Sequence, residues 1–134
     1  MELNTTEWLQ KVLGSESRQA MPITTSVGME LVGKPPGMVY VDGEAQAECI
    51  VALARKYPAI AALTQMDLSV EAEAFGCSVE FPEKEPPNIR ASVATDLASI
   101  EALKAPRVGA GRTWEYLRAA RRAAGQIHDR PVLG

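Results

Sequence analysis

One acidic residue, Asp67, stands where a strand is expected to leave the protein core. The segment before it, residues 59–63, reads Ala-Ile-Ala-Ala-Leu, an unbroken apolar run that is too short for an amphipathic helix. Such a run is typical of a strand that is buried on both faces, as in a parallel sheet. In parallel α/β folds the carboxyl ends of the strands carry the chemical groups. Asp67 is therefore the first candidate for a catalytic carboxylate, and the alternative is a helix-capping or solvated aspartate.

The residues that could ligate a metal are few and scattered. Cys49 and Cys77 form no CxxC pair, and His128 is the only histidine. A zinc site needs about four ligands, or three and a water, so these residues do not predict one. We expect both cysteines to be reduced packing residues and His128 to lie at a helix end. The chain also contains no GxGxxG, P-loop or GxSxG motif.

Composition restricts the class of protein. The 134 residues are 46% hydrophobic and 23% charged, which is typical of one globular domain with a core. The net charge is -3 and no basic block occurs, so nucleic acid is not an expected partner. No apolar run reaches membrane-spanning length and no signal peptide opens the chain. We therefore expect a cytoplasmic protein.

The first part of the chain predicts a βαβ unit. Asn4 and Glu7 fit a capping box at the start of a leading helix that Gly14 ends. Residues 22–27 are rich in β-branched side chains and predict a first strand. Gly28 follows, where backbone could approach a ligand closely, or where the chain simply turns. A helix from Asp42 to about residue 56 and a strand over 59–67 complete the unit, which implies a right-handed crossover and a parallel sheet.

The second part of the chain predicts short elements separated by loops. Ser69 can cap a short helix that Gly76 ends. Residues 78–81 alternate like a strand, and the prolines that follow predict irregular structure to residue 95. Asp96 can cap another short helix, and residues 130–134 predict the start of a third strand. Between them we expect a helix over residues 113–127, with Tyr116, Ala120, Ala123, Ala124 and Ile127 facing inward.

Several segments together resemble the uroporphyrinogen decarboxylase superfamily, and more closely its corrinoid-dependent methyltransferase branch, which includes the methylcobamide:coenzyme M methyltransferases. The most specific segment is residues 66–77, which reads MDLSVEAEAFGC. The likeness covers nearly the whole chain, and its other marks are residues 27–34, 44–47, 79–81, 85–87 and 130–134.

The resemblance implies a fold and a site. The family fold is a (β/α)8 barrel with its active site at the carboxyl ends of the strands. This chain would be the amino-terminal portion of that α/β barrel, with residues 1–21 as a leading helix and connection and 22–134 as an incomplete barrel. Asp67 matches an aspartate that faces the tetrapyrrole in the decarboxylases. Substrate or corrinoid contacts are expected from Gly28, Met29, Glu30 and Met66.

Two departures from the family pattern narrow the expected chemistry. The decarboxylases carry arginines around the glycine that Gly28 matches, and these bind substrate carboxylates. Here the neighbours are uncharged or acidic, including Met29 and Glu30, which argues against uroporphyrinogen decarboxylation. The zinc ligands of the methyltransferase branch lie later in the family barrel, and Cys49, Cys77 and His128 do not match them. A corrinoid carried by a partner protein is thus the expected cofactor, and zinc is expected of the complete enzyme but not of this chain.

We therefore expect part of a methyltransferase that moves a methyl group from a methylated corrinoid to an acceptor such as a thiol. Alone, the fragment should be inactive, because a barrel needs eight strands and about 250 residues. The carboxyl-terminal remainder of the barrel, or an oligomeric partner, would cover the open sheet edge. The alternatives are a non-catalytic tetrapyrrole-binding, corrinoid-binding or assembly module, and a decarboxylase-like lyase that acts on a smaller acid.

Overall fold

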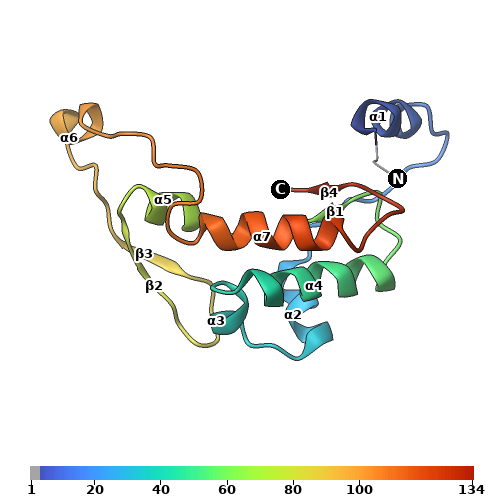
Figure 1. Ribbon diagram of the computed structural model, residues 1–134, viewed down its shortest axis with the longest axis horizontal. Coiled ribbons are helices and arrows are strands. Elements are labelled where there is room, and N and C mark those ends of the chain that lie inside the picture. Colours follow the sequence, from blue (N-terminus) through green and yellow to red (C-terminus); the bar gives the residue numbers. More distant parts are fainter. Residues whose placement is uncertain (1–3) are drawn as a thin grey trace.

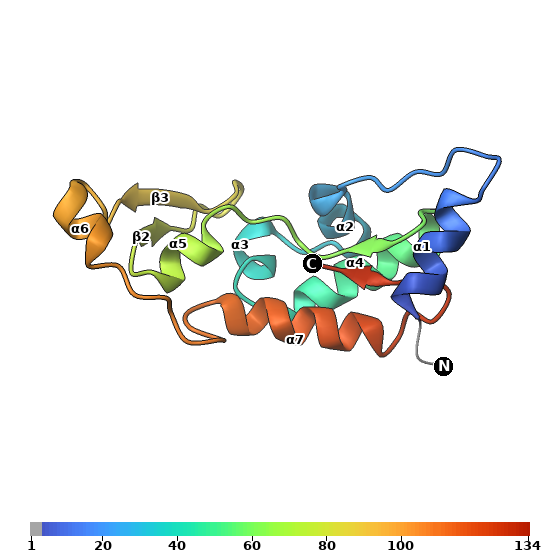
Figure 2. The same ribbon diagram turned by 90° about the horizontal axis from the view of Figure 1, so that it is seen from above.

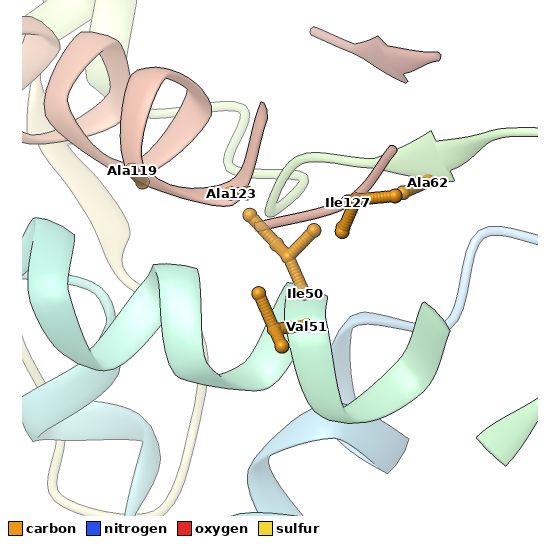
Figure 3. Packing of buried hydrophobic residues seen from close by; sticks show 6 residues of the cluster. All are labelled: Ile50, Val51, Ala62, Ala119, Ala123 and Ile127. Carbon is orange, nitrogen blue, oxygen red and sulfur yellow. The ribbon is translucent and has the colours of Figure 1, made fainter. Parts of the chain in front are cut away.

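Two helices form the middle of the fold in the computed structural model, which describes residues 4–134. Helix α4 (Gly43–Lys56) and helix α7 (Thr113–Ala124) run side by side in both views (Figures 1 and 2). The helix over residues 42–56 is confirmed, because Asp42 caps it by accepting a hydrogen bond from the Glu44 N–H at 2.9 Å. Small side chains on α7 let the two helices approach closely. The shared core, shown in Figure 3, consists of Ile50, Val51, Ala62, Ala119, Ala123 and Ile127.

A short parallel sheet lies against this helix pair. Strand β1 (Ala62–Leu63) pairs with strand β4 (Val132–Leu133), with Ala62 opposite Val132. The Ala62 N–H donates to the Pro131 carbonyl and the Thr64 N–H to the Leu133 carbonyl, both at 2.9 Å. Parallel pairing and a third strand at residues 130–134 are therefore confirmed, although β1 is shorter than the predicted 59–67. The α/β fold class is confirmed with them.

The predicted strand at residues 22–27 is wrong, because helix α2 (Thr25–Val32) begins there. The β-branched side chains favour a strand locally, but packing against α4 overrides this weak preference. The second buried cluster unites α2, helix α3 (Pro36–Val39) and α4 and consists of Met29, Val39, Tyr40, Ala45 and Cys49. The segment before α2 still approaches the sheet, since the Ala20 carbonyl accepts a hydrogen bond from the Ile60 N–H at 3.0 Å.

Gly28 consequently lies inside a helix and not at a strand end. A Cβ atom at this position would be 2.9 Å from Leu53 Cδ1 and 3.0 Å from Cys49 Cβ. The absence of a side chain therefore lets α2 touch α4, and the position serves helix packing.

The two ends of the molecule are formed by a hairpin with a short helix and by the leading helix (Figures 1 and 2). Strand β2 (Ser78–Glu80) confirms the predicted alternation, but its antiparallel partner β3 (Asn88–Ala91) falls where irregular structure was predicted. Helix α6 (Leu97–Glu101) follows, capped by Asp96 as predicted. At the other end, Asn4 caps α1 (Thr5–Leu13), and the Trp8 indole N–H donates to the Ile60 carbonyl at 3.2 Å.

The remaining sequence predictions concern helices α5 (Val70–Ala74) and α7. Gly76, at φ 100°, follows the end of α5 as predicted. On α7 and just after it, Ala123 and Ile127 are buried as predicted, whereas Ala124 is exposed and the buried Ala119 was not predicted. Within residues 4–134, no helix combines the length and the apolar character needed to cross a bilayer.

Candidate functional site

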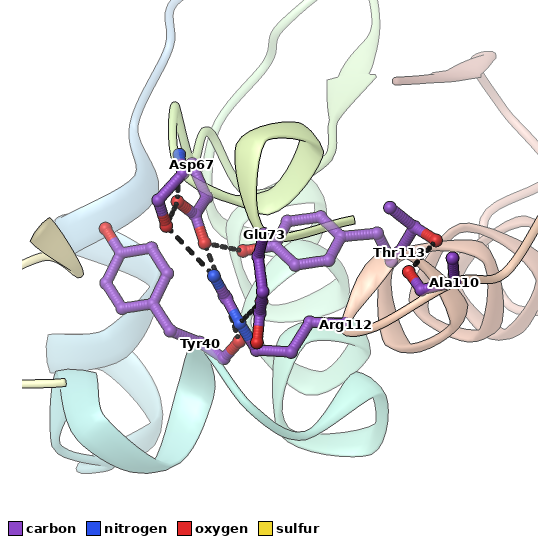
Figure 4. Close-up of polar contacts among 8 residues, drawn as sticks. Tyr40, Asp67, Glu73, Ala110, Arg112 and Thr113 are labelled. Atoms are coloured by element: carbon purple, nitrogen blue, oxygen red, sulfur yellow. Dashed lines mark hydrogen bonds and ion pairs between the residues drawn. The ribbon is translucent and has the colours of Figure 1, made fainter. Parts of the chain in front are cut away.

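Asp67 lies beyond the carboxyl end of β1, in the turn that leads into α5. Its side chain is only 1% exposed. Oδ1 accepts hydrogen bonds from the backbone N–H of Ser69 at 2.8 Å and from its hydroxyl at 2.6 Å. Oδ2 accepts from Arg112 Nη1 at 2.5 Å and from the Tyr116 hydroxyl at 2.8 Å. Each carboxylate oxygen thus accepts two hydrogen bonds, which is its ordinary capacity (Figure 4).

Arg112, the residue before α7, is the centre of this polar network. Its Nε donates to Glu73 Oε2 at 2.5 Å, and Nη1 donates also to the Tyr40 carbonyl at 3.0 Å. Nη2 donates to the Ser69 hydroxyl at 2.9 Å, and the guanidinium lies 4.6 Å from the centre of the Phe81 ring. One buried side chain therefore connects α7 with α3, the turn after β1, α5 and the β2–β3 hairpin.

The network fixes the protonation of its members. Burial opposes ionisation of Asp67, but hydrogen bonds from Ser69, Arg112 and Tyr116 outweigh burial and hold the pKa of Asp67 below its usual value. Burial also works against the charge of Arg112, while Asp67 and Glu73 raise the pKa of Arg112 further. Burial and the Asp67 carboxylate raise the pKa of Tyr116, which stays protonated as a donor. Asp67 and Arg112 are thus a charged, hydrogen-bonded pair near neutral pH.

A groove of about 920 Å³ opens beside this network, at the carboxyl ends of β1 and β4. Its walls are the turn after β1, one face of α7, part of α5, and the loop before α7. Most of the lining side chains are apolar, and the charged ones are Asp67, Glu71 and Arg107. The apolar lining comprises Met21, Ile23, Leu63, Met66, Leu68, Val70, Ala74, Pro106, Val108, Leu117, Ala120 and Leu133.

The structure separates the predicted site residues into two groups. Asp67 and Met66 line the groove. Gly28 and Met29 are buried in α2 against α4, and Glu30 is exposed on the same helix. These three residues do not belong to the groove lining.

Arg112 is the important residue that sequence reasoning missed. Its hydrogen-bond partners Asp67 and Ser69 lie 45 and 43 positions earlier in the chain, so no local sequence motif indicates the contact. The only available signal was a single arginine immediately before the most amphipathic helix, where a cation does not serve as a helix cap.

The candidate metal ligands lie apart. Cys49 is buried between α2 and α4, and burial raises the pKa of its thiol to about 11. Cys77 follows α5, and His128 is exposed after α7. In the part of the chain that the structure describes, no three His, Cys, Asp or Glu side chains are arranged to hold a metal ion. The donor set of the described residues does not fit zinc.

Comparisons with known proteins agree with the fold. Residues 16–134 match the family model described as uroporphyrinogen decarboxylase (URO-D). A search of curated proteins gives no match. Among solved structures, a methyltransferase from Methanosarcina mazei has a TM-score of 0.75 and 20% sequence identity to this chain. The similarity covers 95% of this chain and 40% of that one, so this chain spans less than half of that protein's length.

The fold is therefore that of the amino-terminal portion of a (β/α)8 barrel, with parallel strands and a leading helix. The family match extends from residue 16 through both parallel strands and the whole Asp67 network. This chain belongs to the uroporphyrinogen decarboxylase family.

Proposed function

We propose that this chain is part of a corrinoid-dependent methyltransferase, and that the groove beside Asp67 receives one face of the corrinoid ring. The observation that carries the proposal is the groove itself, which is large, mostly apolar and placed at the carboxyl ends of parallel strands. The similarity in fold between this chain and a methyltransferase supports methyl transfer as the proposed reaction.

The charge of the groove favours a corrinoid over a porphyrinogen. Uroporphyrinogen carries eight carboxylates, and carboxylates are recognised in proteins chiefly by arginine. Among the described residues that line the groove, Arg107 is the single cation, and Glu71 offsets its charge. A corrinoid carries mainly neutral amides at its edge. Backbone groups can hydrogen-bond to these amides while apolar side chains contact the ring, so no cluster of cations is needed.

The chain's own residues would bind and position the ligand. A bound methylcorrinoid would supply a methyl group on cobalt for attack by a thiolate. The apolar faces of Leu117 and Leu133 would exclude water from that bond. Because the Asp67 carboxylate is fully hydrogen-bonded, we assign it the role of shaping the turn that presents Met66 to the groove.

The proposed activity needs more of the barrel. Among residues 4–134, β4 has a strand partner only on its β1 side, so its other edge is open to a further parallel strand. We propose that the carboxyl-terminal remainder of a family barrel, or an oligomeric partner, covers this edge and supplies the zinc-bound thiolate. A separate corrinoid protein would deliver the methyl group.

The test is a titration of the purified chain with hydroxocobalamin, followed by absorbance, against coproporphyrin as a tetracarboxylate competitor. We expect saturable hydroxocobalamin binding and no comparable binding of coproporphyrin. Ala120→Trp, which fills the groove, should weaken binding at least tenfold, whereas Ala124→Trp, one turn along the same helix and exposed, should not. Tighter binding of coproporphyrin, or equal binding by both variants, would contradict the proposal.

A further inference from the structure

Arg112 links two of the walls of the groove. One wall is the turn formed by residues 64–68, and the other is the loop formed by residues 106–109. Arg112 leaves the second wall and reaches the first, where it donates to Asp67 Oδ2 at 2.5 Å and to the Ser69 hydroxyl at 2.9 Å. Arg112 therefore connects the two walls directly, and the Tyr116 hydroxyl on α7 adds a second hydrogen bond to the same Asp67 oxygen at 2.8 Å.

The position of Arg112 is itself strongly determined. The residue is 8% exposed, and two further N–H groups of its guanidinium donate to Glu73 and to the Tyr40 carbonyl. A buried guanidinium that lost any of these partners would leave an unsatisfied donor in a poorly hydrated place. The hydrogen bonds of the guanidinium therefore hold Arg112 in one position, and this fixes the end of the loop formed by residues 106–109.

The loop that Arg112 ends carries groove-lining side chains with little support of their own. Val108 is 92% exposed, and Arg107 is also exposed. Behind the loop stands the ring of Trp114, whose Cε3 would lie 3.1 Å from a Cβ atom at Gly109. Trp114 is thus in close contact with the second wall and can report on its position.

We propose that Arg112 is a positioning residue of the groove, which acts through Asp67 to hold the two walls at the separation that a flat macrocycle requires. The identity of the ligand rests on the proposed function above. The linkage between the walls does not, because it is a property of the free chain.

The test compares Arg112→Lys with wild type in a Trp8→Phe background, in which Trp114 is the only tryptophan. Lysine keeps the charge but cannot serve Asp67, Ser69 and Glu73 at once. We expect amide hydrogen exchange in residues 64–69 and 106–111 to become about tenfold faster or more, with exchange in α4 unchanged. Trp114 emission should shift to longer wavelength, and the Kd for hydroxocobalamin should rise about tenfold. Arg122→Lys is the matched control, because its pair with Glu44 is half exposed.

Each outcome decides the proposal. Unchanged exchange in either wall, in a folded Arg112→Lys protein, would overturn it, since the linkage predicts that both walls loosen together. If Arg112→Lys does not fold, Asp67→Asn replaces it, and the same two segments must exchange faster or the proposal fails. If wild type binds no hydroxocobalamin, the proposed function fails, and the exchange data alone decide whether Arg112 joins the walls.

Discussion

The carboxylate of Glu115 on α7 accepts a hydrogen bond from the backbone N–H of Gly43, the first residue of α4, at 2.8 Å. First-turn N–H groups have no partner within their own helix, and a carboxylate there also suits the positive end of the helix dipole. The helices are so close at this point that a Cβ atom on Gly43 would overlap the backbone carbonyl oxygen of Glu115. The helix pair that forms the core is therefore joined at its amino ends by this hydrogen bond and leaves no room there for a side chain on Gly43.

Gly43→Ala should destabilise the chain by about 1–3 kcal/mol, because the added methyl group forces α4 and α7 apart. Chemical denaturation measures the change. Gly125→Ala is the matched control, since a Cβ atom there meets only ordinary contacts at 3.5 Å and 3.6 Å. Equal stability of the two variants would show that the helices can separate at Gly43 without cost.

Gly28→Ala distinguishes packing from ligand binding. The terminal methyl of Leu53 can move, but the Cβ atom of Cys49 cannot, so we expect a loss of about 1 kcal/mol or more in stability. The folded fraction should bind hydroxocobalamin as wild type does, because Gly28 lies outside the groove lining. A variant of normal stability that lost binding would restore Gly28 as a ligand contact.

Asp67→Asn should lower stability in a pH-dependent way. The pKa of Asp67 lies below its ordinary value of 3.8 in the folded chain, so ionisation of Asp67 stabilises the fold fully above that value. This contribution is lost as the pH falls from about 4 through the lowered folded pKa. Removing the charge takes the Asp67 carboxylate away from the buried Arg112, which keeps its pair with Glu73, at a cost of about 1–3 kcal/mol at pH 7.

Urea denaturation of wild type and Asp67→Asn across this pH range measures the effect. The difference between the two proteins should be constant near neutral pH and should shrink below about pH 4. A difference that does not depend on pH would mean that the carboxylate charge contributes nothing.

Cys49 should resist thiol reagents in the native chain. It is fully buried, and burial raises the pKa of its thiol to about 11, so little thiolate is present near neutral pH. In a Cys77→Ser variant, a disulfide reagent should label the protein only as fast as the chain opens, and should label it rapidly in denaturant. Rapid labelling of the folded variant would contradict this.

The chain alone should transfer no methyl group and decarboxylate no porphyrinogen. Its residues 4–134 contain neither a metal-binding cluster nor a set of arginines in the groove. An assay with methylcobalamin and a thiol, with and without a polypeptide that covers the rest of a family barrel, tests this. Turnover only in the mixture, reduced by Asp67→Ala, is the expected result, and turnover by the chain alone would contradict it.

The sequence by itself determined the features that depend on neighbouring residues. Asn4, Asp42 and Asp96 cap their helices as predicted, because a capping bond spans only two or three positions. The apolar run over residues 59–63 predicted a buried parallel strand with Asp67 at its carboxyl end. The strand is parallel but ends at Leu63, so Asp67 lies four positions beyond it. The resemblance of the chain to the family could also be found from the sequence, because its most specific segment, residues 66–77, is continuous.

Only the tertiary structure decided the features that depend on residues far apart in the chain. Local propensity favoured a strand at residues 22–27. The chain forms helix α2 instead, because the helix buries Met29 against α4. Ser69 stands at the predicted cap of α5, yet its hydroxyl donates to Asp67 and makes no cap bond. The oppositely charged partner of Asp67 is Arg112, 45 positions later. No local pattern encodes such a pair, because only the packing of α7 beside α4 and the sheet brings the two charges out of water together.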